Sequence, residues 1–441
     1  MIAELINPGI VALIVFALMI IFFIVNHPRF PMPVVSVAGC LLCVLLGIST
    51  LPKAMTGFSH DIVFLVIGMD VASQALLKVG VADLIGRAIM KASQDNEKRL
   101  MIVSFLAASL IGWVLNNMTT IMIFLVIFHS IVKVTGNIYM KNITLPMIAG
   151  AMIGGGCTLI GTTPNLVGHQ ILLSNGLQGF KMFDFTPIGI TLTVVIGLMI
   201  YFFSYERGKK IWPKDLVKAD KPDATIEKVT EQIKSEIITE VKDKKKLYTM
   251  AAIMVILITL LVSTIVSLGT AAIFAAVLCI LTGCITHREA FSGMNWGLII
   301  WLAGCFSITE ILNATGGAKL IATTAINSIP GDVTPFVFFA LMTLACMCVS
   351  QVVSDTVCVL VFLPVFLPVA LELGVSPQAV AMGVIYAANL SYLTPLASAQ
   401  IGIALSIGHD FKEIFRYGWL LHIVMYITII IVIPLVFPLT V

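Results

Sequence analysis

Apolar segments alternate with short polar connections along the whole chain. They lie at about 8–26, 33–49, 61–78, 100–133, 145–173 and 186–204, and, after a polar stretch, at about 248–267, 269–284, 296–314, 333–371, 378–407 and 417–439. A helix needs about 20 apolar residues to cross a bilayer, and most of these segments come close to that length. The pattern therefore predicts an all-α polytopic membrane protein.

The same order of segments occurs twice, at an offset of about 236 residues. The stretch TGFSHDIVFLVIG from Thr56 matches SGMNWGLIIWLAG from Ser292, and VLNNMTT from Val114 matches the region of SDTVCVLVF from Ser354. A fixed offset between similar segments is the sign of an internal repeat. The sequence therefore predicts two structural repeats joined by the polar stretch at 205–247.

Two long apolar segments, 100–133 and 333–371, are each interrupted by a polar tip. Each arm beside a tip has about 16 residues, so that a helical arm reaches about 24 Å, short of the hydrocarbon core of about 30 Å. A re-entrant hairpin fits these arms better than two crossings. Each repeat then crosses the membrane five times, and the second repeat is expected to be inverted relative to the first.

The basic residues give this topology an orientation. With the linker 205–247 in the cytoplasm, all of the 26 Lys and Arg except Lys53, Lys181 and Lys319 fall on the cytoplasmic side, as the positive-inside rule requires. We therefore expect a multi-pass protein of the cell (inner) membrane, with both termini outside. Within the linker, apolar residues recur at helical spacing from Ile226 to Val241, which predicts a surface helix joining the halves.

Composition excludes several classes of function. The chain is 59% hydrophobic and 11% charged, with a mean hydropathy of +1.06, whereas about a quarter of a soluble chain is charged. The sequence contains no phosphate-binding glycine loop with lysine, so ATP is not expected to drive transport. The seven histidines are scattered and His169 stands alone, which leaves a membrane enzyme without a catalytic constellation. We expect no enzymatic activity, no covalent cofactor and no nucleic-acid partner.

Four polar or glycine-rich interruptions mark the expected site. Two are the hairpin tips, Asn116–Thr120 and Ser354–Thr356, and two lie inside spans, in GGGCTLIGTTPNLVG from Gly154 and SYLTPLASAQIG from Ser391. Irregular backbone at membrane depth is tolerated where it lines a cavity or is buried in protein. Paired interruptions in two inverted halves point to a transport site near the bilayer midplane.

The groups available there suit a cation and an anion together. The six arginines all lie in connecting segments, and the interruptions supply amide, hydroxyl and carbonyl oxygens with one carboxylate, Asp355. Oxygen ligands suit a hard cation such as Na⁺, and helix N-termini suit an anion. Asp70 lies within its apolar segment, so that Asp70 and Asp355 are candidate coupling acids for H⁺. Glu310, near the end of its segment, is expected to snorkel to the surface.

These residues also carry a resemblance that covers nearly the whole chain. GGGCTLIGTTPNL and SDTVCVLVFLPV, with the order of the segments, resemble the divalent-anion:sodium symporter family of the ion transporter superfamily. The resemblance implies a homodimer that carries a small dianion, such as a C4-dicarboxylate, citrate or sulfate, with Na⁺ by an elevator movement. It implies scaffold parts at 1–95 and 248–330 and moving transport parts at 96–204 and 331–441. The family's extra N-terminal span is expected to be absent, leaving ten spans.

The resemblance also assigns residues. Sodium ligands are implied at Asn116, Asn117, Gly161, Thr162, Ser354, Asp355 and Ala397, and substrate contacts at Asn117, Thr119, Thr163, Pro164, Asn165, Thr356, Ser398 and Gln400. The chain departs from the family pattern where Asn116 replaces a serine, Met118 a threonine and Asp355 an asparagine. The second loop reads Ala397–Gln400 where the family tends to have Thr-Pro-Pro-Asn.

One further class of function stays open at this point, a cation/proton antiporter or an arsenite-type exporter. A cation/proton antiporter or arsenite-type exporter of the same superfamily would also use NNMTT and a membrane aspartate. Proton coupling through Asp355 and the charge of the substrate separate this class from the symporter. An ion channel is disfavoured, because paired hairpins suit alternating access to one central site.

Overall fold

A computed structural model describes residues 7–25, 29–93, 96–135, 140–212, 244–263, 265–317, 320, 334–394 and 398–440. All regular elements in these ranges are helices, accompanied by an isolated bridge between Val375 and Thr440. The first half contains α1 (Pro8–Val25), α2 (Met32–Leu45), α3 (Leu51–Ala54), η2 (Thr56–Ser59), α4 (Asp61–Lys78), α5 (Val81–Ser93), α6 (Glu97–Gly112), α7 (Asn117–Thr135), α8 (Met140–Gly155), α9 (Thr163–Ser174), α10 (Thr186–Met199), η3 (Ile200–Ser204) and α11 (Tyr205–Ile211). The second half contains α13 (Lys244–Ser263), α14 (Leu268–Leu281), α15 (His287–Ser292), α16 (Trp296–Thr315), α18 (Pro335–Val349), α19 (Asp355–Glu372), α20 (Pro377–Asn389), α21 (Ala399–Ser406) and α22 (Phe411–Val436).

The helices confirm the all-α membrane fold. Six of them are long and apolar enough to cross a bilayer, namely Pro8–Val25, Thr186–Ile211, Lys245–Ser263, Trp296–Thr315, Asp355–Glu372 and Phe411–Val436. The four expected interruptions all separate two helices: α6 from α7, α8 from α9, α18 from α19, and α20 from α21. The arms α6 and α18 have 16 and 15 residues, as expected, whereas α7 and α19 have 19 and 18.

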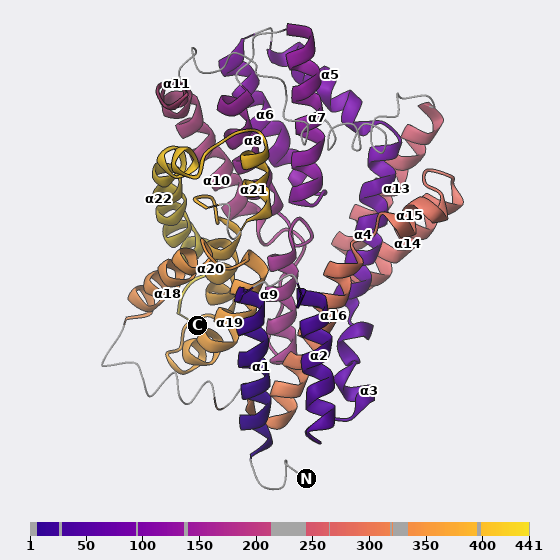
Figure 1. The fold of residues 1–441 in the computed structure, drawn as a ribbon, viewed down its shortest axis with the longest axis vertical. Coiled ribbons are helices and arrows are strands. Elements are labelled where there is room, and N and C mark those ends of the chain that lie inside the picture. The colour runs from indigo at the N-terminus through magenta and orange to yellow at the C-terminus, as the bar shows by residue number, and fades with distance from the viewer. Residues whose placement is uncertain are drawn as a thin grey trace.

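Helices of the two halves pack on one another reciprocally. The helix α4 packs on α14 while α16 packs on α2, and α9 packs on α19 and α20 while α21 packs on α7 and α8. Such exchanged contacts are what a two-fold relation between repeats produces. Figure 1 shows α6 and α7 in the upper half of the view and α18 and α19 in the lower half. This placement agrees with an inverted repeat, although the inversion itself stays a prediction.

Glycines let the first hairpin lie directly on the first broken helix. A Cβ atom built on Gly154 would lie 2.1 Å from the Ser109 carbonyl oxygen, and one on Gly150 would lie 2.3 Å from that of Phe105. The helices α6 and α8 therefore touch backbone to backbone through small residues four positions apart, as membrane helices commonly do. This contact fixes the tip of the hairpin against the loop that follows α8.

The helices α11 and α13 flank the linker and lie in the upper part of Figure 1, which we call the linker end; α1 begins at the opposite, N-terminal end. Helical structure continues from α10 through η3 into α11, so it occupies the first seven residues of the expected linker. The helix predicted at Ile226–Val241 lies outside the described residues.

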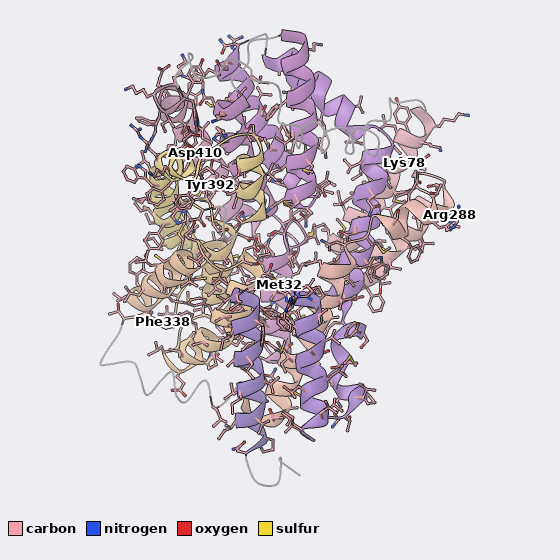
Figure 2. The ribbon with its side chains drawn as sticks, viewed as in Figure 1. Met32, Lys78, Arg288, Phe338, Tyr392 and Asp410 are labelled. Carbon is pink, nitrogen blue, oxygen red and sulfur yellow. The ribbon has the colours of Figure 1, made fainter. Side chains whose placement is uncertain are left out.

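A salt bridge at this end joins α4 to α15. Lys78, in the last turn of α4, pairs with Glu289, and Figure 2 shows Lys78 and Arg288 on the same side of the molecule. Hydrogen bonds from the Lys78 ammonium group and from Thr286 lower the pKa of Glu289 to about 2. The pair holds the segment before α16 against the end of α4.

Candidate transport site

A cavity of about 350 Å³ lies where the two hairpin tips meet the first unwound loop and the helices α4 and α16. A volume of this size is typical of small-molecule sites. The lining residues are Asp70, Ser73, Gln74, Leu77, Asn116, Asn117, Met118, Thr119, Thr162, Thr163, Pro164, Gly293, Asn295, Leu298, Trp301, Ser354, Asp355, Thr356 and Gln400. Segments from both halves of the chain thus form one site.

The first tip presents an asparagine oxygen that has no protein partner. Asn116 precedes α7, and its side-chain oxygen accepts a hydrogen bond from the Met118 N–H at 2.9 Å. Asn117, which opens α7, is 3% exposed, and its Oδ1 is buried without a hydrogen-bond partner. A buried acceptor left unpaired in this way costs about 1–3 kcal/mol, which a bound cation would recover.

Main-chain oxygens surround the same place. A Cβ atom on Gly155 would lie 2.1 Å from Asn117 Oδ1, and one on Gly161 would lie 2.4 Å from the Gly155 oxygen and 2.8 Å from the Gly112 oxygen. Glycines thus let the Asn117 amide and two carbonyl groups crowd together. Amide and main-chain carbonyl oxygens are ligands that suit a hard cation.

A network of buried amides holds the first loop in shape. The Asn165 Nδ2 donates to the carbonyl oxygens of Thr158 and Gly155 at 2.7 and 3.2 Å, and its Oδ1 accepts from Asn389 Nδ2 at 2.8 Å. The Thr162 hydroxyl donates to Asn389 Oδ1 at 3.3 Å. The amide of Asn165 is therefore occupied by the loop, and Asn389, at the end of α20, joins the first loop to the second half.

The second tip carries the carboxylate. Asp355 opens α19, and its Oδ1 accepts from the Thr356 N–H at 2.7 Å, from the Thr356 hydroxyl at 3.3 Å and from the Ser354 hydroxyl at 3.4 Å. These bonds all involve the same carboxylate oxygen. The residue also lines the cavity, so its charge acts directly on whatever binds there.

Each tip is tied to the loop of its own half by a threonine. The Thr158 hydroxyl donates to the Trp113 carbonyl oxygen at 2.6 Å, and the Thr394 hydroxyl donates to the Gln351 carbonyl oxygen. The two threonines are separated by the repeat offset of about 236 residues. The same contact therefore fixes both halves of the site, which supports the repeat.

Most of the residues assigned from the sequence meet at the cavity. Eleven of them line it: Asp70, Asn116, Asn117, Thr119, Thr162, Thr163, Pro164, Ser354, Asp355, Thr356 and Gln400. Gly161, Asn165 and Ser398 lie behind this surface; Ser398 is fully buried, caps α21 and donates to Gln400 Oε1 at 2.6 Å. Ala397 lies outside the described residues. Sequence reasoning did not assign Asn389 and Gln351, which adjoin predicted interruptions, or Thr394, which lies within one.

The charge of the cavity comes from helix ends and two acids. Four helices begin at it, α7 at Asn117, α9 at Thr163, α19 at Asp355 and α21 at Ala399. Their dipoles, together with those first-turn N–H groups that no side chain caps, favour an anion. The described lining includes the carboxylates of Asp70 and Asp355 but no Lys, Arg or His. An anion bound here without a cationic side chain therefore needs a bound cation beside it.

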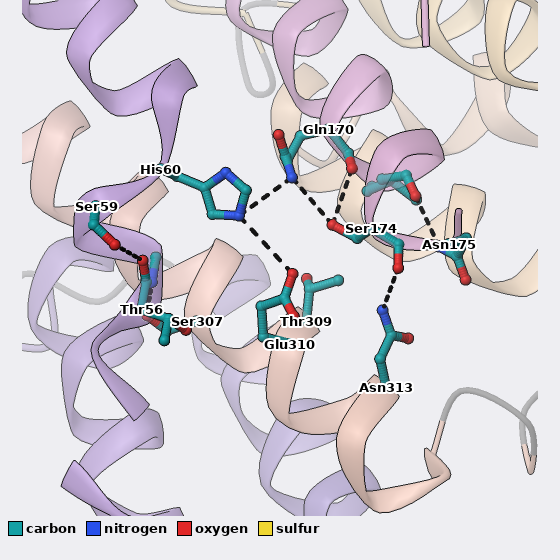
Figure 3. Close-up of polar contacts among 12 residues, drawn as sticks. Thr56, Ser59, His60, Gln170, Ser174, Asn175, Ser307, Thr309, Glu310 and Asn313 are labelled. Atoms are coloured by element: carbon teal, nitrogen blue, oxygen red, sulfur yellow. Dashed lines mark hydrogen bonds and ion pairs between the residues drawn. The ribbon is translucent and has the colours of Figure 1, made fainter. Parts of the chain in front are cut away.

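The cavity reaches the surface toward the linker end, where Gly293 and Asn295 are exposed. Toward the N-terminal end, polar contacts join α9 to the other helices (Figure 3). His60 Nε2 lies 3.2 Å from Gln170 Nε2 and 3.9 Å from Glu310 Oε1, and Asn313 Nδ2 donates to the Ser174 carbonyl oxygen at 3.3 Å. The Glu310 side chain is 41% exposed and faces His60, and its snorkelling to the surface stays a prediction. We interpret the structure as a state that is open at the linker end.

Removing one of these contacts is expected to favour the state that is open at the N-terminal end. Gln170→Ala deletes the contacts to His60 and to the Ser174 hydroxyl, and one lost hydrogen bond of about 1 kcal/mol shifts such an equilibrium about fivefold. The half-saturating substrate concentration measured from the N-terminal side should fall by a similar factor. Ser59→Ala is the control, because the Ser59 hydroxyl bonds only within its own turn, to Thr56. If the half-saturating concentration is unchanged in Gln170→Ala, this contact does not help to close the N-terminal end.

A methyl group at Gly155 should disturb the oxygen cluster. Gly155→Ala places a Cβ atom 2.1 Å from Asn117 Oδ1, so the amide has to move away from the carbonyl groups. For the Na⁺ coupling that the resemblance implies, we expect the Na⁺ concentration for half-maximal transport to rise about tenfold, a loss of about 1.4 kcal/mol. Gly297→Ala is the matched control, since its Cβ would meet nothing closer than 3.5 Å. Equal Na⁺ responses in both variants would contradict the cluster.

Comparison with known proteins assigns the chain to a family. Residues 14–356 match the model of the citrate transporter family, CitMHS. The uncharacterized transporter YfbS of Escherichia coli is 27% identical over 183 residues, which are 42% of this chain and 29% of YfbS, so the match spans less than a third of that relative. The sodium-dependent dicarboxylate transporter SdcS of Staphylococcus aureus is 22% identical over 445 residues, covering 92% of this chain and 82% of SdcS.

A solved structure shares the fold. MtrF of Neisseria gonorrhoeae, described as illuminating a class of antimetabolite efflux pumps, superposes with a TM-score of 0.62 at 14% sequence identity. The match covers 97% of this chain and 94% of MtrF. The family model spans more than half of the chain, and the described helices share the fold of MtrF. The chain belongs to the citrate transporter family.

Proposed function

We propose that the protein is a secondary active symporter that carries a small dianion, such as a C4-dicarboxylate, citrate or sulfate, together with Na⁺. The observation that carries the proposal is the cavity itself, which joins four helix N-termini to an unpartnered asparagine oxygen and contains no described cationic side chain. Similarity to the sodium-dependent dicarboxylate transporter SdcS supports the same ion and substrate class.

Cations bind first and complete the anion site. One Na⁺ binds among Asn117 Oδ1 and the crowded carbonyl groups near Gly161, and a second binds at the tip formed by Ser354 and Asp355. Their charges offset the two carboxylates of the cavity and attract the dianion to the helix N-termini. Thr119, Thr163 and Thr356, which line the cavity, supply hydroxyl groups to the anion.

The hairpins and broken helices at 96–204 and 331–441 move together against a scaffold at 1–95 and 248–330. The contact of His60 with Gln170 crosses this boundary at the N-terminal end, and the cavity borders both parts. A carrier of this kind alternates between states by moving one part past the other around the fixed contents of the site. The homodimer expected from the resemblance stays a prediction, as do the cytoplasmic linker and the inner membrane.

Uptake into proteoliposomes tests the proposal. Labelled succinate, citrate and sulfate are offered to the purified protein with an inward Na⁺ gradient, and then with an inward proton gradient alone. Uptake of at least one anion that follows Na⁺ supports the symporter. Uptake that follows protons alone makes Asp355 or Asp70 the coupling acid. No uptake with either gradient rejects the symporter in favour of a cation/proton antiporter or arsenite-type exporter.

A further inference from the structure

Asp70 differs from the other acid of the cavity because it lies on α4. Within the proposed mechanism, on which this inference rests, α4 belongs to the scaffold, whereas Asp355 travels with the moving part. Asp70 borders the main cavity and also an adjoining cavity of about 30 Å³ lined by Asn116, Thr162 and Thr163. We infer that Asp70 promotes release of the anion at the linker end.

The contact that Asp70 makes does not require a charge. Its Oδ2 accepts from the Asn295 N–H at 3.2 Å, where the segment before α16 crosses α4. At the reciprocal crossing, where the segment before α4 meets α16, the Ser307 hydroxyl accepts from the Gly57 N–H at 3.0 Å. A neutral hydroxyl is thus sufficient to hold such a crossing. The contact with Asn295 therefore does not account for the negative charge of Asp70.

The negatively charged side chain of Asp70 lines the cavity. Among the scaffold residues that line the cavity, Asp70 is the one with an ionisable side chain, beside Ser73, Gln74, Leu77, Gly293, Asn295, Leu298 and Trp301. Two like charges several ångströms apart in partly hydrated protein repel strongly enough to change an affinity about tenfold. Asp70 therefore lowers the affinity for a dianion while the cavity borders α4.

The repulsion acts in one state only. When the moving part carries the anion toward the N-terminal end, Asp355 and its cation move with the anion, and Asp70 stays on α4. At the reciprocal crossing the scaffold supplies the neutral Ser307, and the Glu310 carboxylate on that side faces His60 Nε2 at 3.9 Å and does not line the described cavity. Asp70 thus makes the two faces of the carrier unequal, with weaker anion binding at the linker end, which favours delivery there.

Transport measured separately from each face tests the inference. Right-side-out and inverted membrane vesicles carrying the full chain are prepared, and trypsin cleavage within 205–247 identifies the vesicles that expose the linker. The half-saturating concentration of labelled succinate, or of citrate or sulfate if one of these is the transported anion, is measured at saturating Na⁺ from both faces. In Asp70→Asn and Asp70→Ser it should fall about tenfold at the linker face and stay unchanged at the other.

Matched variants separate charge from fold. Asp70→Ser removes the charge but keeps a short hydrogen-bond acceptor, like Ser307. Asp70→Glu keeps the charge and should behave as the wild type. Glu372→Gln is the remote control, because it removes a carboxylate that does not line the cavity. Half-saturation that is unchanged at the linker face in both neutral variants overturns the inference. Loss of proton-driven uptake in both would overturn it too, by making Asp70 a coupling acid. A wild type that carries none of the three anions instead rejects the proposed function.

Discussion

Asn117→Ala should greatly raise the Na⁺ concentration that transport requires. The substitution removes the buried Oδ1 that has no partner in the protein and leaves the main-chain cluster near Gly161 with one oxygen fewer. One lost ligand worth about 1–3 kcal/mol corresponds to a rise of about 5- to 150-fold in the Na⁺ concentration for half-maximal transport. The measurement is the initial rate of uptake at Na⁺ concentrations that span this range.

A control with the same chemistry distinguishes the site from general damage. Asn175→Ala removes an asparagine whose Nδ2 donates to the Ile171 carbonyl oxygen at the end of α9, away from the cavity. Its Na⁺ response should match that of the wild type. The assignment of the first cation site fails if Asn117→Ala transports with the Na⁺ response of the wild type.

Asp355→Ala is expected to lose transport, whereas Asp355→Asn should keep part of it. Alanine removes the oxygen that accepts three hydrogen bonds at the second tip, while asparagine keeps an oxygen for the Thr356 N–H and loses only the charge. We expect Asp355→Asn to fold normally and to need about tenfold more Na⁺. Initial rates at graded Na⁺ concentrations and at several pH values measure both effects.

The pH series identifies the role of this carboxylate. Unchanged pH dependence in Asp355→Asn, with weaker Na⁺ binding, makes Asp355 a cation ligand. Loss of the pH dependence of uptake makes it the residue that carries a proton. Glu372→Gln, at the far end of the same helix, controls for removal of a negative charge from α19. If Asp355→Asn has the Na⁺ response and the pH dependence of the wild type, Asp355 takes no part in coupling.

Much of the fold could be predicted because the bilayer constrains it. The segment expected at 61–78 is the helix Asp61–Lys78, and that expected at 296–314 is Trp296–Thr315. Apolar length decides such elements, and polar residues in an apolar run decide where they break. The positions of the two tips followed for the same reason.

Contacts between distant segments could not be predicted in the same way. Asn389 completes the loop around Asn165, and His60 meets Gln170 and Glu310, although nothing near these residues in the sequence marks a partner. Such pairs depend on how helices cross. The placement of Asp70 in the cavity also depends on the crossing of α4 with the segment before α16.

The most direct test is whether Na⁺ strengthens anion binding at the cavity. Binding of labelled succinate, citrate and sulfate to the purified protein is measured while Na⁺ is replaced stepwise by K⁺ at constant ionic strength. The account predicts that the affinity for the transported anion rises at least tenfold with Na⁺, and that this rise is lost in Asn117→Ala. Bound Na⁺ completes the anion site, and the cavity has no described cationic side chain to replace it. Equal anion affinity in Na⁺ and K⁺ would contradict the account.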